Sequence, residues 1–250
     1  MTEQVWDPAV LELSDELVAR ATSEGATLRA LGGVGIALRC PSARDGSGLA
    51  RRFSDVDFAV KAGEQKATTA AMGALGLEPA TRFNATQGAS RLLFERADGL
   101  HADVFVGRFA LCHELPLARR LGVDDRTLPL ADLLLTKLQV AELNRKDVTD
   151  TAALLLDHEL TEDDSGINAA YLAGVLAGDW GWWRTVTENL ATVRTMVASL
   201  PVPPDGQAVV ERRLDELEAR IEAAPKGARW RLRARIGERR PWRVEPEARA

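Results

Sequence analysis

The spacing of hydrophobic residues predicts a helix, a strand and a second helix at the start of the chain. Leucine, valine and alanine recur at helical intervals through residues 8–24, and Gly25 is a typical helix end. A short apolar run at 27–31 predicts a strand that stops at Gly32-Gly33. Residues 33–38 predict a short helix after this turn.

Residues 53–60, FSDVDFAV, show the period-two alternation of a strand. The alternation places Asp55 and Asp57 on one face and hydrophobic side chains on the other. A loop is expected before this strand, at 41–52, because proline, serine, aspartate and two glycines occur together there. A helix is expected after it, at 64–75.

Two further strands are predicted at 91–96 and 101–106. Asp98-Gly99 lies between them, and Asp-Gly is a strong hairpin signal, so the two strands should pair antiparallel.

From Pro129 onward the pattern is helical. We expect a helix from Pro129 to Ala141, a second through Asp150 to Leu156, helices at 166–177 and 182–199, a turn at 201–206, and a charged helix around 210–221. The predicted fold class is α+β: a mixed sheet with flanking helices in residues 1–125, followed by a helical part in residues 126–250.

Composition narrows the class of protein. The net charge of −5 argues against non-specific nucleic-acid binding by the whole surface. Cys40 and Cys112 show no metal-ligand spacing, so we expect reduced thiols. The acidic N-terminus does not resemble a signal peptide, and no apolar run approaches the roughly 20 residues needed to span a bilayer. A cytoplasmic protein without a membrane segment is expected.

Asp55 and Asp57 are the main candidates for chemistry. Two carboxylates on one strand face repel each other, and a bound Mg²⁺ or Mn²⁺ is the simplest compensation, because these ions take hard oxygen ligands. Asp103 lies in another apolar strand. If the two strands are neighbours, three carboxylates converge, and such a set can hold two metal ions for phosphoryl transfer. Carboxylates that fall in strands by chance remain the alternative.

Gly32, Gly33 and Ser54 are candidate phosphate-binding residues. Glycine lets the backbone approach a ligand closely, and amides at a helix start favour anions. The hydroxyl group of Ser54 could donate to a phosphate. A tight turn at the glycines and a simple strand-entry role for Ser54 are the alternatives.

These motifs together resemble the signature of the polymerase β-like nucleotidyltransferase superfamily. The resemblance rests on Gly32-Gly33, then Ser54-Asp55-Val56-Asp57, then Asp103 in a later strand. It implies a nucleotidyltransferase fold, metal binding by Asp55, Asp57 and Asp103, and NTP phosphates facing the two glycines. The 22 positions between Gly33 and Asp55 exceed the usual gap, and the loop at 41–52 is expected to absorb the excess.

Residues 128–155 are similar to the helical segment of AbiEii-type nucleotidyltransferases, a group that includes toxins of toxin–antitoxin pairs. The resemblance implies that Lys137 reaches the phosphates of an NTP such as ATP, and that an antitoxin partner is possible. It also matches an Arg/Lys-Asp-x-x-Asp motif, which falls on Arg145, Lys146, Asp147 and Asp150. In this interpretation Lys137 and Asp150 are catalytic, while Lys137 and Asp147 contribute to nucleotide binding.

The residues themselves leave alternatives for these positions. Lys137 shares the apolar face of its predicted helix, where an unpaired charge is costly. It could extend to solvent, or it could point into a cleft and neutralise triphosphate charge. Asp147 could be a helix N-cap. A direct catalytic or lysine-orienting role is the other hypothesis for Asp147 and Asp150.

Residues 226–243 carry one lysine, seven arginines and one glutamate, a net charge of +7, with Trp230 and Trp242 interleaved. Arginines neutralise phosphates and indoles stack on bases, which indicates contact with RNA such as tRNA. The alternation of arginine with Leu232, Ala234 and Ile236 also fits a strand or a docked tail. Packing is the expected role of three further tryptophans, Trp180, Trp182 and Trp183.

The expected activity is transfer of a nucleotide from an NTP to an acceptor hydroxyl, with RNA as the favoured acceptor. Two alternatives stay open. One is a transferase that modifies a small molecule such as an aminoglycoside, and the other is a catalytically silent binding protein of the same fold.

Overall fold

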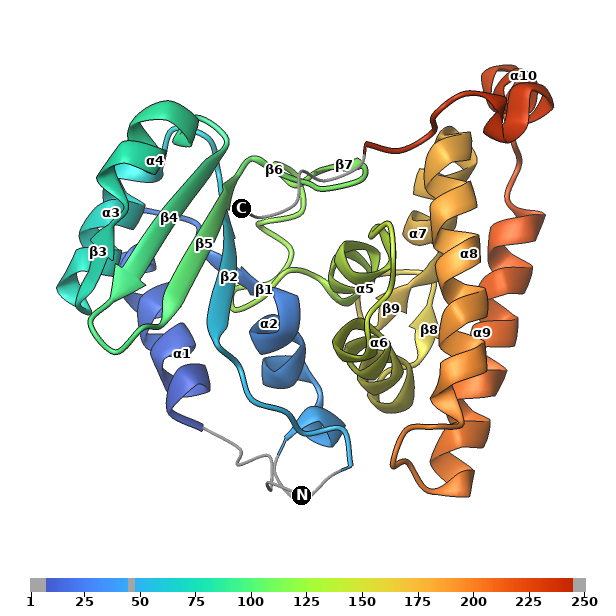
Figure 1. The fold of residues 1–250 in the computed structure, drawn as a ribbon, viewed down its shortest axis with the longest axis horizontal. Coiled ribbons are helices and arrows are strands. Elements are labelled where there is room, and N and C mark those ends of the chain that lie inside the picture. Colours follow the sequence, from blue (N-terminus) through green and yellow to red (C-terminus); the bar gives the residue numbers. More distant parts are fainter. Residues whose placement is uncertain (1–7, 45–47, 245–250) are drawn as a thin grey trace. The chain divides into compact units, whose positions relative to one another are not determined.

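The computed structural model describes residues 8–44 and 48–244, and within these ranges the protein is α+β (Figure 1). The acidic N-terminal residues 1–7 and the middle of the expected loop at 41–52 lie outside the described residues. The chain divides into two compact units. The first comprises Met1–Phe109 and Leu115–Pro129, and the second comprises Ala110–Glu114 and Leu130–Ala250.

A five-stranded mixed sheet forms the first unit, in the order β1-β2-β5-β4-β3. Its strands are β1 (Arg29–Leu31), β2 (Asp55–Val60), β3 (Leu77–Pro79), β4 (Arg91–Arg96) and β5 (His101–Val106). Strands β2 and β5 run parallel, whereas the other neighbours are antiparallel. The predicted hairpin is confirmed, and β4 and β5 have the expected bounds.

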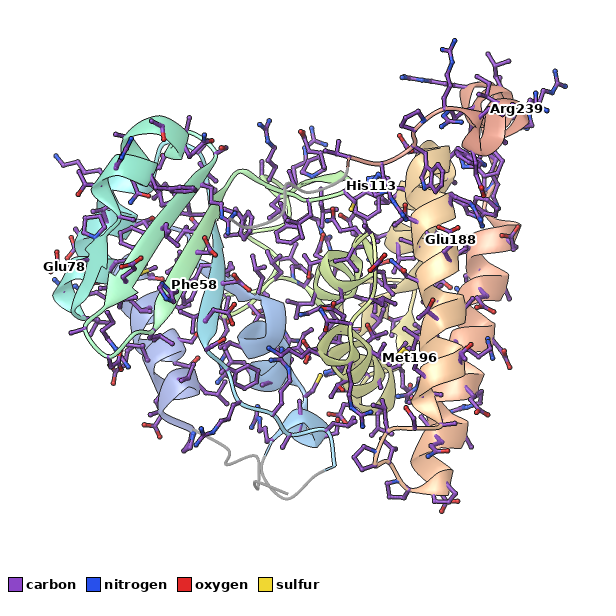
Figure 2. The ribbon with its side chains drawn as sticks, in the orientation of Figure 1. Phe58, Glu78, His113, Glu188, Met196 and Arg239 are labelled. Carbon is purple, nitrogen blue, oxygen red and sulfur yellow. The ribbon has the colours of Figure 1, made fainter. Side chains whose placement is uncertain are left out.

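The helices of the first unit are α1 (Pro8–Ser23), α2 (Gly32–Arg39), α3 (Gln65–Ala74) and α4 (Thr81–Gln87), with a short 3₁₀ turn at Pro41–Ala43. Helices α1 and α3 pack against each other. The hydrophobic set of the sheet is fully buried; it includes Val56, Phe58, Phe94 and Val104. Figure 2 labels Phe58 on the sheet. Because side chains alternate along a strand, the carboxylates of β2 point to the opposite face.

Several short elements were not predicted. Strand β3 begins directly after Gly76, which has a φ of 76°. Helix α4 contains no fully buried side chain, so it lacks the apolar periodicity on which helix prediction depends. A small ribbon, β6 (Arg108–Ala110) with β7 (Glu114–Pro116), was also missed.

Helices dominate the second unit. They are α5 (Leu130–Leu138), α6 (Arg145–Asp157), α7 (Ala169–Gly178), α8 (Trp180–Val197), α9 (Pro204–Ala223) and α10 (Ala228–Ile236), with a 3₁₀ turn at Gly237–Arg239. Two short strands, β8 (Leu160–Thr161) and β9 (Ile167–Asn168), pair parallel. Helix α5 packs against α6, α7 and α8, and α8 packs against α9.

Three expectations for the second unit need correction. The expected turn at 201–206 is shorter, because α9 already begins at Pro204, and proline suits the first helical turn. The strand alternative for 226–243 is wrong, because residues 228–236 form α10. Asp147 is not an N-cap, because Asn144 caps α6 and Asp147 is the third residue of that helix.

Cys40 and Cys112 are both buried, and no disulfide joins them within the described part of the chain. Across the described ranges, none of the helices combines the length and apolar character that crossing a membrane requires.

Candidate functional site

The pairing of β2 with β5 brings the predicted carboxylates together on one sheet face. The register sets Asp57 opposite Asp103 and Asp55 opposite His101. Residues opposite each other in a parallel pair project to the same face, so all three aspartates share it. Asp103 is 5% exposed, and Asp55 and Asp57 are half-buried. The expectation that the two strands are neighbours is confirmed.

Arg91 of β4 holds the third carboxylate. Its Nε donates to Oδ1 of Asp103 at 2.8 Å, and its Nη2 lies 2.7 Å from Oδ2. Two parallel contacts of this kind are the strong form of an ion pair, because the guanidinium fork matches the carboxylate. The Arg91 guanidinium also lies 5.2 Å from the ring centroid of Phe105. Asp103 therefore has its charge compensated by the protein itself.

Gly32 lies directly against the carboxylate of Asp57. It has a φ of 65°, and a Cβ atom added there would collide with Oδ2 of Asp57. Only glycine combines this backbone conformation with the close approach. A Cβ atom on Gly33 would collide with the guanidinium of Arg51, a flexible group that can move away, and would lie 3.0 Å from the ring of Phe53. The two glycines thus differ: Gly32 is fixed by the candidate site and Gly33 is less constrained.

The start of α2 offers backbone donors beside this carboxylate. Helix α2 begins at Gly32, and its N-cap residue, Leu31, provides no side-chain hydrogen bond to the first amides. The first amides of a helix lack intrahelical partners and favour anions. Ser54 is exposed, and its hydroxyl lies 3.5 Å from Oδ1 of Asp55. The first amides of α2 and the hydroxyl of Ser54 are hydrogen-bond donors of the kind that a phosphate group requires.

Within the described ranges, no three histidine, cysteine, aspartate or glutamate side chains are grouped so as to hold a metal ion. The reason is partly visible at Asp103, whose oxygens are occupied by Arg91. A pair of carboxylates still fits Mg²⁺, because this ion is usually bound by one or two carboxylates together with substrate phosphates and water. Asp55 and Asp57 have that chemistry.

Lys137, Asp147 and Asp150 form a separate cluster in the second unit. Lys137 projects from α5, and its Nζ lies 2.8 Å from Oδ2 of Asp150 and 3.4 Å from Oδ1 of Asp147, both on α6. The lysine side chain is 13% exposed and that of Asp150 is 3% exposed. The ammonium group of Lys137 therefore forms ion pairs with two carboxylates. Asp147 also accepts a hydrogen bond from the backbone of Asn144 at 3.4 Å, which completes a capping box.

No protein-family model matches this sequence, and no curated protein matches it. The two resemblances noted from the motifs therefore stay predictions. The structure brings Asp55, Asp57, Asp103 and Gly32 together within the first unit, and Lys137, Asp147 and Asp150 together within the second.

The basic segment 226–243 docks on the second unit through its tryptophans. Trp230 packs edge-on against Trp183, with ring centroids 5.3 Å apart, and Trp242 packs against Trp180 at 6.2 Å. The docked-tail interpretation is thus confirmed. Packing is also confirmed for Trp180 and for Trp182, which are each 6% exposed.

Arginines remain on the outside of this segment, at positions 229, 231, 235, 239 and 240. The indoles that were expected to stack on bases already have partners within the chain. The exposed side chains of the segment include these arginines together with Leu232 and Glu238.

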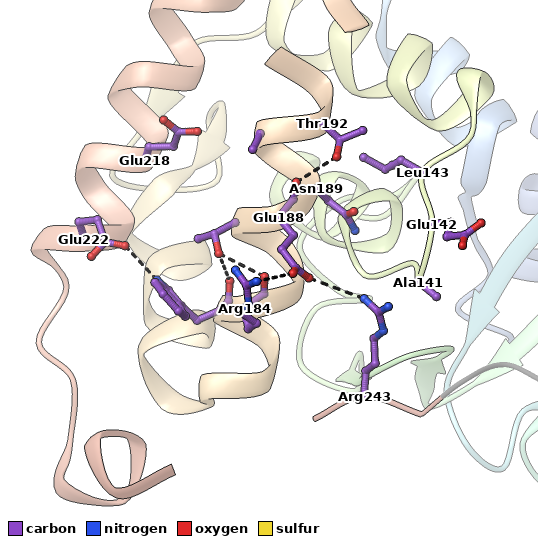
Figure 3. Close-up of a pocket in the computed structure, with 13 residues that line it drawn as sticks. Ala141, Glu142, Leu143, Arg184, Glu188, Asn189, Thr192, Glu218, Glu222 and Arg243 are labelled. Carbon is purple, nitrogen blue, oxygen red and sulfur yellow. Dashed lines mark hydrogen bonds and ion pairs between the residues drawn. The ribbon is translucent and has the colours of Figure 1, made fainter. Parts of the chain in front are cut away.

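A groove of about 1010 Å³ lies beside α8 and α9, bounded by the loop that contains Glu142 (Figure 3). Glu188 in this groove contacts Arg184 at 2.6 Å and Arg243 at 3.8 Å. Glu218 contacts Arg194 at 2.9 Å. Arginines therefore balance the charges of these two glutamates.

Proposed function

We propose that this chain is a metal-dependent nucleotidyltransferase, which transfers a nucleotide from an NTP to an acceptor hydroxyl. The observation that carries the proposal is the register of β2 and β5, which places Asp55, Asp57 and Asp103 on one sheet face, with Gly32 against Asp57. Carboxylates on neighbouring strands beside an uncapped helix start suit a metal–triphosphate complex.

In this proposal Asp55 and Asp57 hold Mg²⁺ or Mn²⁺. The bound ion supplies charge neutralisation and polarisation of the phosphate oxygens. Asp103 is assigned as a third ligand or as the group that helps to deprotonate the acceptor. Either role requires that it share or release Arg91, which otherwise keeps it neutralised.

The phosphates are assigned to the glycine turn. The amides at the start of α2, at Gly32 and Gly33, would bind phosphate oxygens, and the hydroxyl of Ser54 would donate to another. The acceptor oxygen then forms a bond to the α-phosphorus while the bond to the β-phosphate breaks. The acceptor proton passes to a base, and pyrophosphate leaves.

Lys137 is assigned to neutralise triphosphate charge, an assignment that rests on the resemblance to AbiEii-type enzymes. Asp150, at 2.8 Å, and Asp147, at 3.4 Å, keep its ammonium group in place. A phosphate-binding role requires that this ammonium group exchange one of its carboxylate contacts for a phosphate oxygen.

RNA, and tRNA in particular, is the proposed acceptor, because the outer side of the segment 226–243 carries five exposed arginines. A small molecule such as an aminoglycoside is the alternative acceptor. An antitoxin protein as partner follows only from the resemblance.

The first experiment is transfer of label from each of four α-³²P-NTPs, with Mg²⁺ or Mn²⁺, into total RNA. Asp57→Asn should reduce the transfer at least a hundredfold and leave the unfolding transition nearly unchanged, because it removes one half-buried charge. Asp205→Asn is the matched control, since it makes the same chemical change at an exposed position at the start of α9.

Full activity of Asp57→Asn would contradict the assignment. Label in small molecules and none in RNA would select the alternative acceptor. If no acceptor is labelled but NTP still binds, the chain is a catalytically silent binding protein, a second candidate that the Arg91–Asp103 ion pair favours.

A further inference from the structure

Asp103 lies between two different chemical partners in the sheet. Its strand, β5, is flanked by β2, which carries Asp57, and by β4, which carries Arg91. Asp57 is opposite Asp103 in the register, and Arg91 is two residues from Leu93, which is opposite Asp103 on the other side. Because side chains alternate along a strand, all three charged groups project from one face. The carboxylate of Asp103 therefore has the metal-binding candidates on one side and a guanidinium group on the other.

The ion pair of Arg91 with Asp103 is largely removed from solvent. The side chain of Asp103 is 7% exposed and that of Arg91 is 30% exposed, and the two carboxylate oxygens lie 2.8 and 2.7 Å from guanidinium nitrogens. A buried carboxylate needs a cationic partner, because an uncompensated buried charge is costly. A divalent cation meets the same need as a guanidinium, so Arg91 and a metal ion compete for this carboxylate.

Two aromatic rings hold Arg91 independently of Asp103. The guanidinium lies 5.2 Å from the ring centroid of Phe105 and 6.0 Å from that of Phe83. Contacts of this kind attract the cation to the ring face and leave its N–H groups available to an acceptor. A phosphate group matches the guanidinium fork as a carboxylate does, so it can take the place of Asp103.

The order of the strands indicates which phosphate group this is. Gly32 follows β1, and β2 and β5 separate β1 from β4, the strand of Arg91. NTP phosphates bound at the glycine turn are therefore on the far side of the carboxylates from Arg91. The phosphate that pairs with Arg91 then belongs to the acceptor. A guanidinium in that place favours an anionic acceptor such as RNA over a cationic aminoglycoside.

We propose that Arg91 withholds Asp103 from the metal site until a phosphate group of an RNA acceptor takes over the guanidinium. The exchange breaks the ion pair, makes the carboxylate available as a ligand or a base, and leaves Arg91 bound to the acceptor. Asp103 is then competent only in the complete complex, so an NTP bound alone is protected from transfer to water. Arg91 is a positioning residue in this scheme, which rests on the proposed nucleotidyltransferase function.

The first arm of the test is calorimetric titration of the full chain with Mn²⁺ alone. Arg91→Gln should tighten Mn²⁺ binding about tenfold, because it releases Asp103 to the metal. The double variant Arg91→Gln/Asp103→Asn should lose this gain. Arg96→Gln is the matched control, since Arg96 lies on the same strand, is 31% exposed and pairs with Asp98 at 2.6 Å. It changes the charge equally and should leave Mn²⁺ affinity unchanged.

The second arm is the converse measurement, without metal. Fluorescence anisotropy in EDTA follows binding of a labelled RNA oligonucleotide and, separately, of labelled ATP. Asp103→Asn frees the guanidinium of Arg91 and should tighten RNA binding about tenfold. Adding Arg91→Gln should abolish that gain. Asp98→Asn, which removes the carboxylate of the control pair, should leave RNA binding unchanged.

Three outcomes would overturn the role of Arg91. The first is Mn²⁺ affinity that Arg91→Gln leaves unchanged or that Arg96→Gln raises equally. The second is RNA binding that Asp103→Asn does not tighten, and tighter binding of ATP alone would likewise contradict an acceptor phosphate. The third is a gain in Mn²⁺ affinity that persists in the double variant, because the metal would then not use Asp103.

These measurements are independent of transfer activity. Both gains without any transfer of label would contradict the transferase function and support the exchange at Arg91. Mn²⁺ binding that survives Asp57→Asn would contradict the metal site and with it both proposals. Circular dichroism verifies the fold of each variant. Arg91→Lys keeps the charge but cannot hold both carboxylate oxygens, so it should give a smaller gain in Mn²⁺ affinity and replaces Arg91→Gln if that variant does not fold.

Discussion

At the residue scale, Gly32 explains why a glycine pair precedes the carboxylates. The motif predicted that a phosphate-binding turn stands here, but the contact with Asp57 depends on the pairing of β1 with β2, which sets Leu31 opposite Asp57. A left-handed backbone and an adjacent carboxylate at the same residue leave no room for a side chain.

Gly32→Ala should therefore destabilise the protein by more than the cost of placing an alanine in a backbone conformation with positive φ. Gly25→Ala is the control, because Gly25 also has a positive φ, of 85°, but an added Cβ would meet nothing within 4 Å. We expect a loss of about 1 kcal/mol for Gly25→Ala and about 2–3 kcal/mol for Gly32→Ala, measured by urea unfolding. Equal losses at the two positions would refute the contact with Asp57.

Arg91 shows the limit of prediction at this scale. The hairpin, its register and the face of Asp103 follow from alternation and the Asp-Gly turn. The register sets Leu93, and not Arg91, opposite Asp103. The arginine reaches the carboxylate diagonally, and such contacts depend on side-chain rotamers that no sequence periodicity encodes.

At the element scale, α5 and α6 are linked by a buried ion cluster. The apolar face of α5 could be predicted, and so could the cost of a lysine on it. The partners of Lys137 could only be named as hypotheses, because they lie on the next helix, α6. The structure places the Lys137 ammonium 2.8 Å from Asp150.

Lys137→Met should destabilise the second unit by about 2–4 kcal/mol, because removing one partner of a buried pair exposes the cost of burying the other. Lys146→Met, at an exposed position of α6, should change stability by less than about 0.5 kcal/mol. A double-mutant cycle with Asp150→Asn, followed by urea unfolding, measures the coupling. Additive effects in that cycle would show that the two charges do not stabilise each other.

The C-terminal helix shows how a pattern can mislead. Arginine alternates with apolar residues from 231 to 236, and alternation is typical of a strand. The half-buried residues of α10 are instead Trp230, Arg233, Ala234 and Ile236, which recur at intervals of three and four as on a helix. The packing of Trp230 on Trp183 favours the helical period over the strand period. This contact joins residues far apart in the sequence, so the pattern of a few neighbouring residues cannot predict it.

At the scale of the whole molecule, the α+β class and the change from sheet to helices near residue 129 could be predicted. Residues 110–114 belong to the second unit, and this could not be predicted from the sequence, because it depends on packing between segments about 70 residues apart. His113 illustrates this packing. Its ring stacks on Trp182 with centroids 4.9 Å apart, and its Nε2 lies 2.8 Å from the hydroxyl of Thr185.

This packing predicts how stability changes with pH. The pKa of His113 is lowered from 6.5 to about 4, mainly by burial; Asp179 opposes this shift and nearby Arg243 adds to it. In the unfolded chain the pKa is close to 6.5, so between pH 6.5 and 4 the unfolded state binds a proton that the folded state does not. His113 therefore costs no stability above pH 7, and its cost grows as the pH falls to 4.

Because the ring is only partly shielded from solvent, we expect a loss of about 1–2 kcal/mol from this residue over that interval. The measurement is urea unfolding from pH 7.5 to 4.5, followed by tryptophan fluorescence, since Trp182 reports on the unit that contains His113. His113→Gln removes the titrating imidazole, while other groups contribute equally to both proteins. The difference between the two curves of stability against pH therefore isolates the contribution of His113. That difference should shrink or reverse toward low pH, and parallel curves would show that the histidine is protonated in the folded state.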